Sequence, residues 1–147
     1  ALSLAGALPK LGIRAATLAS VAAQLAAERR TPARAVRRRG FQAILGFDVF
    51  MRLLDRTAPR FATFFTNHVA SAMHRYWAAG HPDDYDEIAL GEDWMTRYRD
   101  EVPWAMGRAD RMIGRLADFA DENPDYELWI ASSMGQGPTM AQTLRIP

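Results

Sequence analysis

Apolar side chains recur at helical spacing through the first part of the chain. In residues 11–29 they fall near one face and predict an amphipathic helix; they are Leu11, Leu18, Val21, Ala22 and Leu25. Thr31 and Pro32 end this helix and can begin the next, with Thr31 as the cap. A second helix is predicted over residues 33–56. Its half from 41 to 54 is apolar on almost every side, so we expect it to be buried on more than one side.

Two short apolar runs break the helical spacing and are rich in strand-forming residues. Residues 61–65 do not alternate apolar with polar side chains, which is typical of a strand covered on both faces in a parallel sheet. Residues 127–131 form the second predicted strand, and the helical chain between the two runs serves as a crossover. The pattern therefore predicts an α/β fold that is helix-rich and has at least two parallel strands in one sheet.

The crossover is predicted to be helical over residues 67–79 and again over residues 92–121, with an acidic, turn-rich loop over residues 83–93. Pro103 lies inside the second helical region. It either kinks a single long helix or stands in the first turn of a new helix that begins near Asp100.

Composition and charge narrow the classes of function. Of the 147 residues, 49% are hydrophobic and 24% are charged, which is typical of a globular domain. The chain has no cysteine, which excludes disulfides, thiolate metal sites and cysteine nucleophiles, and no apolar run is as long as a membrane span. The net charge of +1 gives no case for a nucleic-acid partner. The basic run over residues 29–39 could contact phosphate or an acidic lipid surface, or could be a solvated helical face.

Polar side chains follow the first predicted strand. If residues 67–77 are helical, Asn67, Ser71 and His74 share one face, because they lie four and three residues apart. His68 then points elsewhere. The shared face could hold a metal ion, bind an oxyanion or supply an acid or base. Alternatively, Asn67 is a helix cap and the histidine is a packed, hydrogen-bonded side chain.

A second polar turn follows the second predicted strand, over residues 132–137. Ser132 and Ser133 supply hydroxyls, and the backbone N–H groups of the turn could cradle an anion. The alternative is a glycine turn that only reverses the chain. Because the carboxyl ends of parallel strands meet at one edge of a sheet, we expect both turns to face a ligand at that edge.

These two turns resemble the metal-binding motifs of the alkaline phosphatase superfamily, in its type I phosphodiesterase and sulfatase-like branch. In that family a strand leads to an Asp followed four residues on by a His, and a later strand ends in Ser-Asp-His-Gly. His74 matches the first His, whereas Ala70 replaces the first Asp, and Ser133 and Met134 replace the second Asp and His. The resemblance covers mainly residues 58–138 and implies a fragment of the family's parallel-sheet fold.

The resemblance implies hydrolysis or transfer of phosphate or sulfate esters, with His74 as the surviving metal ligand or acid–base residue. Because most ligands are replaced, we expect no cofactor for this chain alone, and a divalent metal such as zinc only if the full-length protein supplies other ligands. The alternative is a non-catalytic binding or scaffold module that holds a small anionic or sugar-linked ligand at the sheet edge. Its binding residues would be Asn67, Ser71, His74, Ser132 and Ser133.

The resemblance also divides the chain into a helical insert or cap over residues 1–57 and a strand–helix–strand part of an α/β core over residues 58–147. We expect one domain that is incomplete by itself, since an apolar helix and two central strands need neighbours. The remainder of the same polypeptide would supply them, and neither a nucleic-acid partner nor a membrane span is expected.

Overall fold

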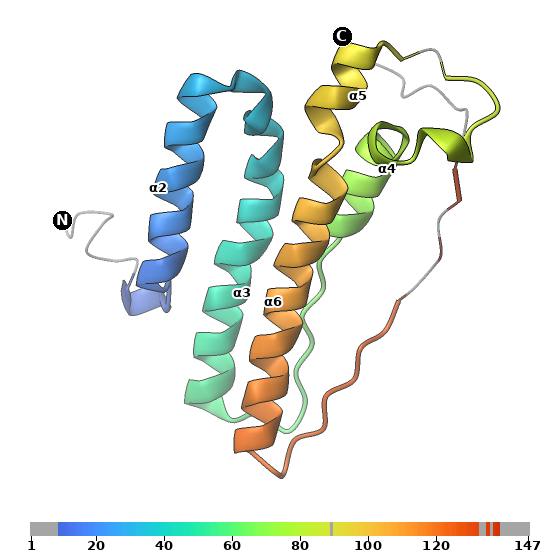
Figure 1. Cartoon of the computed structure of the whole chain (residues 1–147). Helices are drawn as coiled ribbons and strands as arrows, with labels where there is room; N and C mark the ends of the chain where they lie inside the picture. Colours follow the sequence, from blue (N-terminus) through green and yellow to red (C-terminus); the bar gives the residue numbers. More distant parts are fainter. Residues whose placement is uncertain (1–8, 89, 133–134, 136, 139–147) are drawn as a thin grey trace, which may run out of the picture. The chain divides into compact units, whose positions relative to one another are not determined.

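The regular elements among the described residues are all helices. The computed structural model describes residues 9–88, 90–132, 135 and 137–138. The chain divides into two compact units between Thr66 and Asn67. In Figure 1 the first unit holds η1 (Pro9–Leu11), α2 (Ala15–Arg30), η2 (Pro32–Arg37) and α3 (Arg38–Thr57), and the second holds α4 (His68–Gly80), η3 (Pro82–Asp84), α5 (Glu92–Tyr98) and α6 (Glu101–Glu122).

The predicted α/β fold is wrong, because neither predicted strand forms. Within the described part of the chain, residues 61–65 and 127–131 lie outside every helix and pair with no other strand. A strand needs a neighbour to take its backbone hydrogen bonds, and the elements that flank these runs are helices. The described residues therefore contain no parallel sheet, and no sheet edge at which the two polar turns could meet.

Phe64 holds the first of these runs against α3. Its ring centroid lies 5.1 Å from that of Phe47 and 5.3 Å from that of Phe50. Phe61 and Phe65 remain 82% and 81% exposed. The run thus packs one aromatic side chain against a helix and leaves the others in water, which differs from the two covered faces expected of a central strand.

In the first unit, α2 and α3 form an antiparallel hairpin joined by η2 (Figure 1). The first predicted helix is confirmed as α2, and Pro32 takes the first position of η2, where its missing N–H costs nothing. The side chain of Thr31 makes no capping hydrogen bond there.

The start of α2 is tied to the middle of α3. The Arg14 N–H donates to Oδ2 of Asp48 over 3.1 Å, and Asp48 is 1% exposed. A carboxylate at this position also meets the positive end of the α2 dipole. Gly12 allows the close approach, because its φ of 91° disfavours other residues and a Cβ there would clash with the side chain of Arg52.

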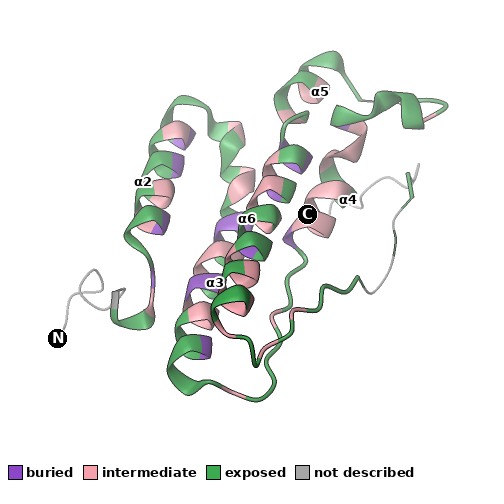
Figure 2. Cartoon of the chain, turned by 60° about the horizontal axis from the view of Figure 1, so that its bottom comes forward, coloured by how far each residue is buried: buried purple, intermediate pink, exposed green. Residues whose placement is uncertain are grey.

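The buried side of α2 is largely polar. Thr17, Gln24 and Glu28 are buried, whereas Leu25 is 48% exposed (Figure 2). The predicted apolar face is therefore wrong for Leu11, Ala22 and Leu25, which are all exposed. Helical periodicity assigns the inward face by apolarity alone, but here two polar side chains turn inward because they gain partners in η2 and α3.

In the second unit, α4 packs against α5 and α6. The predicted helix over residues 67–79 is confirmed as α4. The region over residues 92–121 is two helices, and α6 begins at Glu101, which places Pro103 in its first turn. The second of the two alternatives for Pro103 is thus confirmed.

The interior of the second unit is small. On α6, Val102 and Ala105 are each 2% exposed and Met112 is 6% exposed. Where α4 meets α5, the ring of Tyr76 stacks on that of Tyr98 at 5.0 Å between centroids. These contacts hold α4 in place and so fix which of its polar side chains turn inward.

Candidate functional site

The polar residues predicted for the first turn do fall on one side of α4. Asn67 precedes the helix, and its carbonyl accepts a hydrogen bond from the Ser71 N–H over 2.8 Å. The Asn67 side chain makes no capping bond. Asn67 and His74 are exposed, and Ser71 is partly exposed. Asn67 and His74 are thus on the solvent side of the helix start and of α4.

The second predicted turn follows α6, and the described residues form no sheet edge at which it could meet the first turn. Ser132 is exposed in the segment that follows α6, and Ser133 and Met134 lie outside the described residues. Within the described residues, no group of three histidine, aspartate or glutamate side chains is placed to hold a metal ion. The zinc and ligand roles assigned to these residues stay predictions.

The buried histidine of α4 is His68. Its Nε2 donates to the Ala105 carbonyl on α6 over 3.2 Å, and the side chain is 6% exposed. Burial removes water from the charged form and lowers the pKa of His68, although the backbone carbonyl partly opposes this effect. His68 therefore joins α4 to α6, and burial favours its neutral form.

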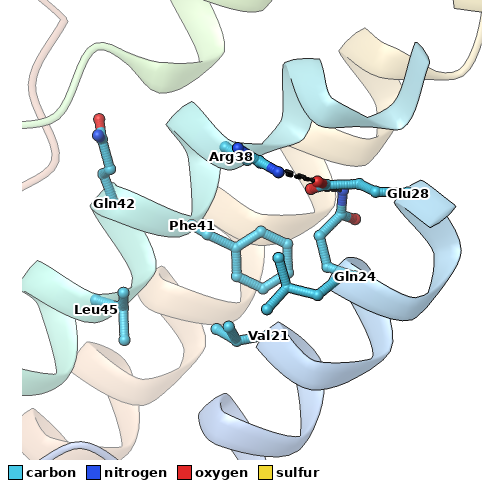
Figure 3. Close-up of a pocket in the computed structure, with 8 residues that line it drawn as sticks. Val21, Gln24, Glu28, Arg38, Phe41, Gln42 and Leu45 are labelled. Carbon is cyan, nitrogen blue, oxygen red and sulfur yellow. Dashed lines mark hydrogen bonds and ion pairs between the residues drawn. The ribbon is translucent and has the colours of Figure 1, made fainter. Parts of the chain in front are cut away.

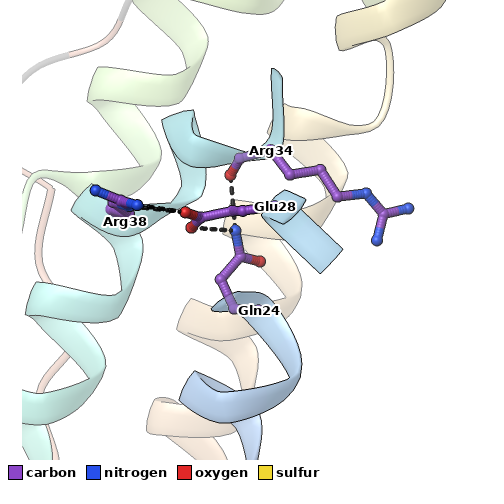
Figure 4. A network of polar contacts seen from close by, with 4 residues as sticks. All are labelled: Gln24, Glu28, Arg34 and Arg38. Carbon is purple, nitrogen blue, oxygen red and sulfur yellow. Dashed lines mark hydrogen bonds and ion pairs between the residues drawn. The ribbon is translucent and has the colours of Figure 1, made fainter. Parts of the chain in front are cut away.

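A connected network of polar side chains lies in the first unit, where α2, η2 and α3 meet (Figure 4). The amide of Gln24 donates to Oε1 of Glu28 over 3.0 Å and to the Arg34 carbonyl over 2.7 Å. The Arg38 guanidinium donates to Oε2 of Glu28 through Nε at 2.8 Å and Nη2 at 2.6 Å. Both oxygens of Glu28 are thus engaged, by two different elements.

Glu28 supplies the negative charge of this network and accepts hydrogen bonds from both Gln24 and Arg38. Hydrogen bonds from Arg38 and then Gln24 lower the pKa of Glu28, and its side chain is only 7% exposed. The same contact raises the pKa of Arg38, whose side chain is 66% exposed. Glu28 is inside the hairpin and Arg38 is at its surface. Because Glu28 is on α2 and Arg38 begins α3, their bond holds the two helices together on either side of η2.

Beside this network, α2 and α3 enclose a groove of about 320 Å³ (Figure 3). Each helix contributes residues at spacings of three, four and seven, which is one stripe of a helix surface. The lining residues are Val21, Gln24, Leu25 and Glu28 from α2, and Arg38, Phe41, Gln42 and Leu45 from α3. The groove is apolar along its length, and charged at the end next to η2.

The same end of the hairpin carries a dense cluster of arginines, which we call the arginine cluster. Residues 29–39 contain six arginines and no acidic residue; they are Arg29, Arg30, Arg34, Arg37, Arg38 and Arg39. Residues 1–47 hold eight basic residues and one acidic residue, Glu28, for a net charge of +7. Residues 48–147 hold ten basic and sixteen acidic residues, for a net charge of −6.

Comparison with protein-family models, curated proteins and solved structures finds no match to this chain. The resemblance to the alkaline phosphatase superfamily therefore stays a prediction from the two turns. What the geometry offers is a charged helical hairpin with an adjoining groove. From the sequence, the basic run over residues 29–39 was open to two interpretations, an anion contact or a solvated face, because a run of like charges is weak evidence by itself.

Proposed function

We propose that this chain is a non-catalytic binding module that holds an anionic partner on the α2–η2–α3 hairpin. The observation that carries the proposal is the arginine cluster at one end of the hairpin. Five of its six arginines are exposed, and the sixth, Arg37, is partly exposed. Like charges gathered on one surface create a local potential that attracts an anion and speeds its association.

The fixed geometry of the hairpin supports binding over a merely solvated face. Glu28, Gln24 and Arg38 bond α2, η2 and α3 to one another, so the arginines are presented on an ordered backbone. Ordering before binding lowers the entropy lost on association. Arginine also presents a planar fork of donors that matches carboxylates and phosphates.

Ester hydrolysis is the other function that the sequence suggested. It rests on the resemblance and on His74, which is exposed on α4. No described helix is both long and apolar enough to span a membrane. This finding does not distinguish ester hydrolysis from anion binding. We base the proposal on the hairpin, where charge and an ordered backbone occur together.

The test is binding of the chain to fluorescently labelled poly-L-glutamate at low ionic strength, followed by anisotropy. One variant changes four exposed arginines of the cluster to glutamine, and a matched control changes four exposed arginines elsewhere. The cluster variant is Arg29→Gln, Arg30→Gln, Arg34→Gln and Arg39→Gln, and the control is Arg56→Gln, Arg60→Gln, Arg97→Gln and Arg99→Gln.

Both variants lower the net charge by four, and both leave the Glu28–Arg38 pair intact. We expect the cluster variant to bind at least about tenfold more weakly and the control to bind within about twofold of the wild type. Binding of the wild type should also weaken as salt is added. Equal losses in the two variants would show that only total charge matters, and the proposal would fail.

A further inference from the structure

We infer, resting on the proposed function, that the partner is a protein that presents an acidic amphipathic helix, and that the apolar side chains of this helix insert into the groove between α2 and α3. The arginine cluster selects for negative charge but does not by itself specify a class of partner. The groove specifies the class of partner, because its apolar lining next to that charge favours apolar side chains beside the partner's carboxylates.

The lining of the groove fits one face of a helix. Its apolar lining includes Val21 and Leu25 from α2 and Phe41 and Leu45 from α3, and the two residues on each helix are four positions apart. Figure 3 shows Val21 beside the ring of Phe41. Each lining stripe spans two helical turns, or about 10 Å along the helix axis. Apolar side chains at positions i, i+3, i+4 and i+7 of a third helix would follow the same length.

The polar rim of the groove sets the chemistry around those apolar side chains. Arg38 stands at the end next to η2 with its side chain 66% exposed, and Gln42 is exposed beside it. Carboxylates that flank the apolar stripe of a partner helix would meet Arg38, the arginine that lines the groove. Charge complementarity thus chooses an acidic helix over a neutral or basic one.

Two other anionic partners fit the same observations less well. A nucleic acid would satisfy the arginines through its phosphates but offers no aliphatic side chains for Val21, Leu25 and Leu45. A bilayer surface is flat on the scale of a groove that is only about 320 Å³ in volume, whereas the side chains of a helix can insert into it. The acidic helix is the partner that uses both the charge and the concavity.

Leu25 is the side chain on which the test depends. It lines the groove yet is 48% exposed, so changing it to glutamine removes apolar contact surface without emptying the core. Leu53 is a matched control, because it is on α3, is 51% exposed and does not line the groove. Neither Leu25→Gln nor Leu53→Gln changes the charge of the arginine cluster.

The probe is a synthetic helical peptide of about 20 residues, long enough to cover both stripes, with leucines on one face and glutamates flanking them. A second peptide has the same composition with the leucines spread around the helix. We expect Leu25→Gln to weaken binding of the first peptide about tenfold and to leave poly-L-glutamate binding unchanged. Leu53→Gln should bind both probes like the wild type.

The outcomes separate the inference from the proposed function. If the cluster variant loses poly-L-glutamate binding but Leu25→Gln still binds the peptide normally, the groove inference is overturned and the proposed function stands. The same holds if the dispersed peptide binds equally well, or if vesicles of anionic phospholipid or duplex DNA bind more tightly than the peptide. If the cluster variant binds every probe like the wild type, both fail.

Discussion

His68 is the buried side chain from which we expect a pH dependence of the second unit. It is the first residue of α4, and its imidazole reaches the Ala105 carbonyl of α6. Neutral imidazole can donate this bond from Nε2 while remaining in an apolar interior. A proton on Nδ1 would add a charge that burial disfavours, and the lowered pKa of His68 expresses that cost.

The second unit should therefore lose stability as the pH falls. The pKa of His68 lies below its ordinary value of 6.5 in the folded chain, so below that pH the unfolded chain binds more protons than the folded chain. The contribution of neutral His68 is complete above about pH 6.5 and declines from there as protonation favours unfolding. The measurement is the urea midpoint of unfolding at about pH 7.5 and about pH 5.5.

His68→Gln is the diagnostic variant for this pH dependence, because glutamine can still donate to the Ala105 carbonyl but does not titrate. It should flatten the difference between the two midpoints. His74→Gln, on the exposed side of the same helix, should keep the difference. An unchanged pH dependence in His68→Gln would assign the effect to another group.

At the scale of elements, the hairpin of the first unit depends on a bond between residues ten positions apart. Glu28 ends the buried stripe of α2, and Arg38 begins α3. The lowered pKa of Glu28 means that the folded chain favours its carboxylate. Its contribution to stability is therefore present above its ordinary pKa of 4.5 and is lost as the pH falls below that value.

Glu28→Gln and Arg38→Gln should each lower the thermal midpoint of unfolding at neutral pH, and the double variant should lower it by less than the two effects added together. The reason is that each single change removes the same pair of hydrogen bonds. The measurement is thermal unfolding followed by circular dichroism. Fully additive effects would mean that the pair contributes nothing as a pair.

The helices were predictable to the extent that their signals are local. The helical stretches of α2 and α4 can be recognised within a few neighbouring residues, whereas the local sequence left two alternatives open for Pro103. The inward face of α2 could not be predicted, because Gln24 and Glu28 are buried by partners in η2 and α3 that no window of α2 contains.

The two strand predictions failed for a different reason. Residues 61–65 have the composition of a strand, but a strand forms only where another backbone takes its hydrogen bonds. Composition gives no information about that neighbour. The described residues therefore offer no sheet edge at which Asn67, Ser71 and Ser132 could meet, and the ligand roles of these residues stay predictions.

At the scale of the whole molecule, charge and apolar surface are both distributed unevenly. The net charge of +7 over residues 1–47 and −6 over residues 48–147 gives the chain a basic part and an acidic part. Large apolar side chains also stay exposed in the two runs outside the helices: Phe61, Phe65, Trp129 and Ile130. A total charge of +1 and an average hydrophobic content conceal both features.

The run over residues 61–65 permits a direct test of which apolar side chains support the fold. Phe64→Ser removes a ring that packs on Phe47 and Phe50 and should cost about 1–3 kcal/mol of unfolding free energy. Phe61→Ser with Phe65→Ser removes rings that are 82% and 81% exposed and should change it by less than about 0.5 kcal/mol. Urea unfolding measures both.

The same pair of variants should separate stability from surface behaviour. Exposed rings bind hydrophobic dyes and promote association, so Phe61→Ser with Phe65→Ser should lower dye binding and light scattering on heating while the unfolding midpoint stays constant. Phe64→Ser should lower the midpoint instead. If the exposed pair proves as destabilising as Phe64→Ser, then both rings are buried in solution. The run would then be packed on two sides, and its second side would need a contact other than the one that Phe64 makes with Phe47 and Phe50.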